Sequence, residues 1–255
     1  MKKHMTQHVL RIGLMLSWLI GAAFIVLSST ARADHVPPGI LVIHFNTPPD
    51  YMQRPVGEDK YTTGDIKDAM QLAKIGDAEA QSNLGVMLAS RGDYKEAAYW
   101  EQKAANSGLD TAAYNLGTLY FNGQGFPQDY AKAHEYFAQA AKRGNKYAEF
   151  QLGMTYYTGQ GVQKDPAQEI YWYKKAARQG LPAAAYNLGV IYNNGDEVAA
   201  DYVQAYAWML LAQKGGLDAK DALTTIATNL SPAQLQAAEK MSHNLPFTPQ
   251  SGMRQ

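Results

Sequence analysis

The chain has 255 residues, with 23 basic and 23 acidic residues, and it contains no cysteine. The lack of cysteine excludes disulfides, thiol nucleophiles, thiolate metal sites and a bacterial lipoprotein anchor. The balanced charge excludes the electrostatic footprint of a nucleic-acid-binding protein.

Residues 1–33 have the pattern of a secretory signal peptide. A positive start, an apolar stretch and a small-x-small motif follow one another: Lys2, Lys3 and Arg11; Ile12 to Leu27; and Ala31-Arg32-Ala33. We expect cleavage after Ala33, a periplasmic or secreted protein, and no stable membrane anchor afterwards. The remaining chain would have 19 basic and 23 acidic residues, a formal charge of −4. The alternative is an uncleaved N-terminal anchor, because the apolar stretch is close to spanning length.

The next segments are an irregular arm and a capping helix. Residues 34–62 are rich in proline and include the apolar stretch Ile40 to Phe45. Because that stretch argues against plain disorder, we expect it to pack along the rest of the chain or to dock on a partner. Residues 63–76 are predicted to form a single helix that closes the N-terminal side of the fold.

An internal repeat dominates the middle of the chain. Leu-Gly pairs occur at 84–85, 116–117, 152–153 and 188–189, with spacings of 32, 36 and 36 residues. A second glycine marker recurs with the same rhythm at Gly76, Gly108, Gly144, Gly180 and Gly216. The two markers predict four units, 77–108, 109–144, 145–180 and 181–216, each consisting of two helices and a loop.

The glycine of each Leu-Gly pair lies inside a predicted helix, where glycine costs about 1 kcal/mol relative to alanine. Four such glycines, Gly85, Gly117, Gly153 and Gly189, therefore need a structural reason. We expect the second helix of each unit to approach too closely to allow a Cβ, with alanines such as Ala104, Ala140 and Ala176 at the facing positions. Asp129, Asp165 and Asp201 stand where the second helices should have their N-caps.

The C-terminal flank is predicted to close the array. Residues 217–243 contain two further helices, and Ser231 followed by Pro232 is typical of a helix start. We expect residues 244–255 to form a mobile tail.

The repeated pattern resembles a known family. Ala-x-x-x-Leu-Gly-x-x-Tyr, then Gly-x-Gly-Val/Phe-x-x-Asp, then Trp/Tyr-x-x-Lys/Gln-Ala-Ala-x-x-Gly is similar to the SEL1-like repeat, a longer relative of the tetratricopeptide repeat. The best copy runs from Ala148 to Gly180, and the resemblance covers Gly76 to Gly216. It implies an all-α, right-handed α-solenoid of helical hairpins and a non-catalytic role in protein binding. The first unit has a shorter loop and the fourth lacks the second loop glycine, as is usual for terminal repeats.

The sequence offers no candidate catalytic, cofactor or metal site. No two histidines form a metal-ligand pair at helical spacing with a carboxylate, and His134 fits a surface or half-buried position. The Gly-x-Gly loops lack the strand and third glycine of a dinucleotide site. We therefore predict neither an enzyme nor a cofactor-dependent protein.

Stacked hairpins create a concave face, and a second stripe on the first helix of each unit is the candidate for it. Aromatic side chains and methionine are frequent on that stripe in units two to four, and such surfaces suit protein recognition. The candidate partner-binding residues are Tyr114, Phe121, Tyr147, Phe150, Met154, Tyr157, Tyr186 and Asn193. The competing interpretation is that Tyr114, Phe150 and Tyr186 pack against the next unit.

Three narrower functions stay open at this point. Some exported bacterial members of the family neutralise secreted toxins such as phospholipases, so the chain could be an immunity protein. Some cysteine-rich relatives are described as binding or hydrolysing β-lactams, but their disulfide framework is absent here. Aromatic side chains could also stack on sugars in a peptidoglycan binder.

Overall fold

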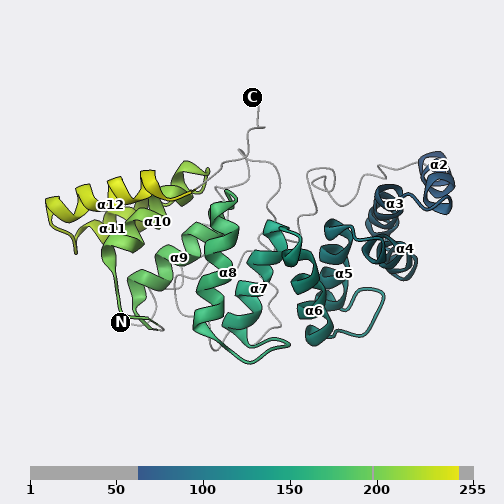
Figure 1. Ribbon diagram of the computed structural model, residues 1–255, viewed down its shortest axis with the longest axis horizontal. Coiled ribbons are helices and arrows are strands. Elements are labelled where there is room, and N and C mark those ends of the chain that lie inside the picture. Colours follow the sequence, from purple (N-terminus) through teal and green to yellow (C-terminus); the bar gives the residue numbers. More distant parts are fainter. Residues whose placement is uncertain (1–62, 197, 247–255) are drawn as a thin grey trace, which may run out of the picture.

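The computed structural model describes residues 63–196 and 198–246, and within these residues it contains eleven α-helices and no strand (Figure 1). The helices are α2 (Thr63–Lys74), α3 (Ala78–Ser90), α4 (Tyr94–Asn106), α5 (Asp110–Asn122), α6 (Tyr130–Lys142), α7 (Lys146–Thr158), α8 (Pro166–Arg178), α9 (Pro182–Asn194), α10 (Tyr202–Lys214), α11 (Lys220–Ala227) and α12 (Pro232–Asn244). The predicted signal peptide and arm lie outside the described residues.

The helix ends follow from local side-chain chemistry. The carboxylate of Asp129 accepts a hydrogen bond from the backbone N–H of Lys132 at 3.0 Å, and Asp201 caps α10 in the same way at 2.9 Å. Asp165 accepts from two backbone N–H groups at the start of α8, at 3.0 and 3.1 Å. The three predicted N-caps are thus confirmed, and each satisfies donors that a helix start leaves without a partner.

The helices pair into four hairpins, α3–α4, α5–α6, α7–α8 and α9–α10, and we call the members of each pair its first and second helix. The second helix of one hairpin packs on the first helix of the next, so that the hairpins stack in chain order. In Figure 1 the stack forms an arc, with α2 at one end and α12 at the other. The chain is therefore an all-helical solenoid, as the repeat predicts.

The core runs along the whole stack. One cluster of buried residues joins α2, α3 and α4, a second joins α4 to α7, and a third continues from α7 to α11. Tyr147 packs against both the second and the third cluster, and so connects them. A hairpin therefore buries apolar side chains between its own two helices and completes its core against its neighbours.

Helices cover both ends of the stack. At the N-terminal side α2 packs on α3, and at the C-terminal side α11 and α12 pack on α10. α12 begins with a capping box between Ser231 and Gln234, with Pro232 in the first turn. It continues through Asn244, which the sequence assigned to a tail.

Candidate protein-binding surface

The eight candidate side chains all lie on first helices. They come from α5 (Tyr114 and Phe121), α7 (Tyr147, Phe150, Met154 and Tyr157) and α9 (Tyr186 and Asn193). Their burial differs, and it separates them into two groups of four.

Four of these side chains belong to the core rather than to a surface. Tyr114, Phe150, Met154 and Tyr157 have exposed fractions of 3%, 0%, 6% and 7%. The ring of Phe150 lies 5.4 Å from the ring of Tyr173 on the second helix of its own hairpin. The prediction that these four side chains line an open concave face is therefore wrong, because neighbouring helices cover them.

Burial also changes the chemistry of Tyr114. Its ring centroid lies 5.9 Å from that of Phe137 and 6.1 Å from that of Tyr147. Desolvation raises the pKa of its hydroxyl to about 12, although a hydrogen bond with Gln151 acts in the opposite direction. Tyr114 therefore stays neutral and ties α5 to α7, which is the packing role left open by the sequence.

The other four candidates are half-buried and reach the surface. Phe121 makes an edge contact with the ring of Tyr130, with centroids 5.1 Å apart, and Tyr147 carries the ammonium of Lys146 over its ring at 5.4 Å. Tyr186 packs beside the third core cluster, and the side-chain amide of Asn193 donates to Asn194 at 3.2 Å. Partner contact by these four stays a prediction.

The glycine of each Leu-Gly pair lies where the second helix comes closest. A Cβ on Gly153 would lie 2.6 Å from ring atoms of Tyr173, and one on Gly117 would lie 2.6 Å from ring atoms of Phe137. A Cβ on Gly85 or Gly189 would meet Glu101 or Met209 at 2.8 Å. The predicted close approach is present, but large side chains face the glycines rather than the predicted alanines.

Glu101 is a buried carboxyl group between the first two hairpins. It is 2% exposed, and it accepts hydrogen bonds from the hydroxyl of Ser82 on α3 and the amide of Asn115 on α5, both at 2.8 Å. Burial raises its pKa to about 8, and these hydrogen bonds only partly oppose that rise. The group thus joins three helices, and its burial favours the protonated form.

A second buried carboxylate, Glu149, is ionically paired. Its Oε1 atom lies 2.9 Å from the ammonium of Lys175, and its Oε2 atom accepts from the amide of Gln179 at 2.8 Å. Both partners belong to α8 or its C-cap, so this cluster joins the two helices of the third hairpin. Glu101 lies beside a hydroxyl, that of Ser82, but both side chains are buried, so this contact joins helices inside the fold.

The described residues hold no group of three or more side chains that could bind a metal ion, and none of their helices is long and apolar enough to cross a membrane. His134 is half-buried, 2.9 Å from the hydroxyl of Thr155, and burial lowers its pKa. It acts as a packing residue between α6 and α7.

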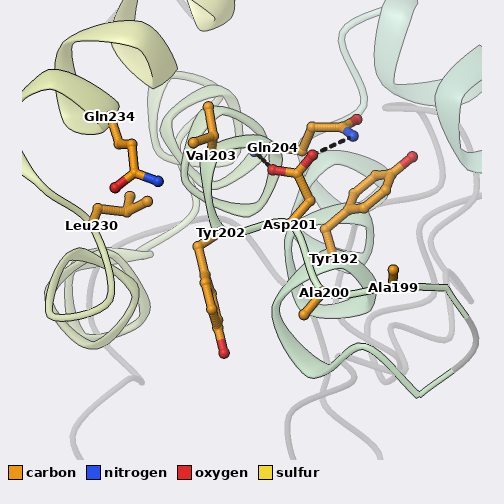
Figure 2. A pocket seen from close by; sticks show the side chains of 9 residues that line it. All are labelled: Tyr192, Ala199, Ala200, Asp201, Tyr202, Val203, Gln204, Leu230 and Gln234. Atoms are coloured by element: carbon orange, nitrogen blue, oxygen red, sulfur yellow. Dashed lines mark hydrogen bonds between the residues drawn. The ribbon is translucent and has the colours of Figure 1, made fainter.

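A small cavity of about 350 Å³ lies between the last hairpin and α12 (Figure 2). Its lining includes Asp201 and Gln234, but both are occupied by helix caps. Asp201 accepts from the backbone and side chain of Gln204, both at 2.9 Å, and Gln234 accepts from the backbone of Ser231 at 2.9 Å. The side chains of Asp201, Gln204 and Gln234 in this cavity therefore serve the helix starts of α10 and α12.

Sequence reasoning missed the exposed aromatics of the second helices. Tyr99 on α4 and Tyr171 on α8 are 53% and 51% exposed, which is more than any candidate on the first helices. Each is followed by a tryptophan and, four residues after the tyrosine, by a lysine. The repeated Tyr-Trp-x-x-Lys pattern, two units apart, was the signal that could have found them.

Comparison with known proteins agrees with the geometry. The Sel1 repeat model matches residues 78–109, 111–145, 146–181 and 182–216, close to the four predicted units. No curated protein sequence matches the chain.

Solved structures of other proteins share the fold. A protective antigen of uropathogenic Escherichia coli strains, displaying an SLR fold, has 31% identity and a TM-score of 0.65 over 78% of this chain and 47% of its own. The chain thus spans about half the length of that protein. A Sel1 repeat protein from Oxalobacter formigenes has 27% identity and a TM-score of 0.59, over 71% of this chain and 78% of its own. Because the family model covers more than half of the sequence, the chain belongs to the Sel1 repeat family.

Proposed function

We propose that the chain is a non-catalytic protein-binding module of the cell envelope, which contacts its partner along the first helices of hairpins two to four. The Sel1 repeat fold commonly serves as a scaffold for protein interactions. The observation that carries the proposal is the set of half-buried side chains Phe121, Tyr147 and Tyr186, which recur on one stripe of successive first helices. Aromatic side chains of this kind dominate the energetics of protein interfaces.

The N-terminal pattern supports the envelope location. Positive residues, an apolar stretch and Ala31-Arg32-Ala33 fit export and cleavage. Fractionation of cells that express the full chain should place the protein in the envelope fraction, with Asp34 as the first residue by mass spectrometry. Recovery in the cytoplasm with an intact N-terminus would contradict this part of the proposal.

Site-specific photocrosslinking tests the binding surface. A benzophenone amino acid at position 147 or 186 should form a discrete adduct in an envelope extract, and unlabelled wild-type protein should compete it away. The matched control is Thr224, an exposed residue of α11 outside the stripe. Equal labelling from the control position, or no adduct from the stripe, would contradict the proposed surface.

The same experiment separates the narrower functions. A single secreted toxin in the adduct would identify an immunity protein, and a structural envelope protein would identify an assembly factor. Turnover of a β-lactam reporter by the purified protein would overturn the non-catalytic assignment.

A further inference from the structure

The second helices carry two copies of one aromatic and cationic arrangement. In each, a tyrosine and the next residue, a tryptophan, meet edge to face, with centroids 5.1 Å apart on α4 and 5.0 Å apart on α8. A lysine ammonium lies over the rings, at 4.7 and 5.0 Å on α4 and at 5.9 and 4.7 Å on α8. We call these the outer clusters: Tyr99, Trp100 and Lys103, and Tyr171, Trp172 and Lys175.

The tyrosines of the outer clusters are not explained by folding. Tyr99 and Tyr171 stand at equivalent repeat positions and are each more than half exposed. The same position is occupied by Glu135 in the second hairpin and by Ala207 in the fourth. Since neither an aromatic ring nor a polar group is required there, the two tyrosines contribute mainly to the surface.

The surface around the outer clusters is basic, although the chain as a whole is balanced in charge. The C-terminal halves of α4, α6 and α8, residues 99–106, 135–142 and 171–178, carry five cations and one exposed acid, Glu135, because Glu101 is buried. The five cations are Lys103, Lys142, Lys174, Lys175 and Arg178. Cations in the last turn of a helix also interact favourably with the helix dipole, but that effect does not explain the adjacent tyrosines.

The five cations differ in how far they are available to pair with another molecule. Lys175 is 2.9 Å from the buried carboxylate of Glu149 and about one-third exposed, so part of its charge is compensated within the hairpin. Lys103 and Arg178 are exposed, and the only salt bridges found among the described residues involve Lys132 and Lys175. Lys103 and Arg178 are therefore the strongest candidates for pairing with a carboxylate from another molecule.

We propose that the outer clusters bind an acidic polypeptide segment that carries aromatic or aliphatic side chains between its carboxylates. This surface goes beyond the first-helix surface proposed above and does not depend on it. The two clusters lie on α4 and α8, with α6 between them in the order of the stack, and the hydroxyl of Tyr136 on α6 donates to the side chain of Gln102 on α4 at 2.6 Å. An extended segment that contacts both clusters would therefore cross α6. Carboxylates would meet Lys103 and Arg178, while apolar side chains would cover Tyr99 and Tyr171.

An acidic polypeptide fits this surface better than an anionic membrane does. The indole of Trp100 is 6% exposed and lies beneath Tyr99, so it has no free face to insert into lipid. The two clusters also belong to separate helices, α4 and α8, of an arc-shaped stack (Figure 1), which an extended chain can follow more easily than a flat bilayer can.

Fluorescence anisotropy tests the proposal with a labelled peptide of alternating glutamate and tyrosine, and with the same peptide carrying lysine in place of glutamate. The full chain should bind the glutamate peptide and not the lysine peptide. Tyr99→Ser with Tyr171→Ser should weaken binding about tenfold. Lys103→Gln with Arg178→Gln should weaken it by a similar factor and also reduce its salt dependence.

The matched control removes the same charge elsewhere. Lys220→Gln with Lys240→Gln, on the capping helices α11 and α12, should leave peptide binding unchanged, and thermal melts should show that every variant is folded. Equal loss in this control would reveal non-specific charge attraction and overturn the proposal. The proposal would also be overturned if the wild-type chain did not bind the glutamate peptide. It would be overturned as well if the chain sedimented with phosphatidylglycerol vesicles and this sedimentation required the same tyrosines and cations.

Discussion

Replacing Glu101 with glutamine should remove a pH-dependent loss of stability. In the folded chain the carboxyl group is 2% exposed and accepts hydrogen bonds from Ser82 and Asn115. Glutamine has the same shape as the protonated acid, its Oε1 atom can still accept from Asn115, and its amide can donate to the hydroxyl of Ser82. The substitution therefore preserves the neutral form and eliminates only the ionised one.

The magnitude follows from the raised pKa of Glu101, which moves from 4.5 to about 8 on folding. Between these values the folded state holds a proton that the unfolded state has released, so the free energy of unfolding falls as pH rises. Each pH unit in this interval costs about 1.4 kcal/mol, which amounts to about 3 kcal/mol by pH 7, about 4 kcal/mol by pH 8 and about 5 kcal/mol at the plateau above pH 9. About one pH unit below 4.5 and one pH unit above 8, this contribution becomes constant.

Urea unfolding from pH 4.5 to 9 measures the effect directly. The stability difference between Glu101→Gln and the wild type should be near zero at pH 4.5, grow with pH and level off above pH 8. Glu135→Gln removes an exposed carboxylate from α6 and should change stability by less than about 0.5 kcal/mol throughout. A difference for Glu101→Gln that stays constant across this range would refute the assignment of a buried, neutral acid.

Three further substitutions test packing, capping and the surface. Gly153→Ala should lower the free energy of unfolding by about 1–2 kcal/mol in urea, because a Cβ 2.6 Å from a buried tyrosine ring outweighs the gain in helix propensity; a more stable variant would show that the helices can separate freely. Asp165→Ala should cost about 1–2 kcal/mol by the same assay, whereas Asp93→Ala, whose side chain makes no cap hydrogen bond, should cost less than half of that. Tyr157→Ala should lower the melting temperature much more than Phe121→Ala, because only Tyr157 is a core residue; the reverse order would contradict their burial.

The sequence predicted the architecture well because the architecture is periodic. A glycine that recurs at the same place in four units indicates a close helix contact, and the aspartates before the second helices of units two to four indicate side-chain caps. Both signals are local, so they need no knowledge of the three-dimensional arrangement. The unit boundaries follow from them to within one or two residues of the family match.

The binding surface was harder to predict, because exposure depends on contacts between hairpins. Helical periodicity places the stripe that contains Tyr114 and Phe150 away from the hairpin's own core. In the structure, however, these two rings contact Phe137 and Tyr173 on the second helices of their own hairpins, and the ring of Tyr114 also contacts Tyr147 of the next hairpin. Helical periodicity gives the direction of a side chain around its own axis and says nothing about the next hairpin. The exposure of Tyr99 and Tyr171 was missed because both tyrosines lie on amphipathic helices, and the sequence of such a helix does not show which aromatic rings the neighbouring hairpins leave uncovered.

The alanines at the second-helix positions illustrate a related limit. Small residues at Ala104, Ala140 and Ala176 are fully buried, as close packing requires, yet the side chains opposite the glycines are larger. Sequence spacing identified the tight contact, but the rotation of one helix against the other selects which residue makes it.

The central claim is that the first helices present a protein-binding surface, and the affinity of the photocrosslinked partner for a surface variant tests it most directly. Tyr147→Ala with Tyr186→Ala should weaken that affinity by at least about tenfold in isothermal titration calorimetry, while the circular dichroism spectrum keeps its helical shape. Unchanged affinity, or a loss that appears only when the helices melt, would contradict the account.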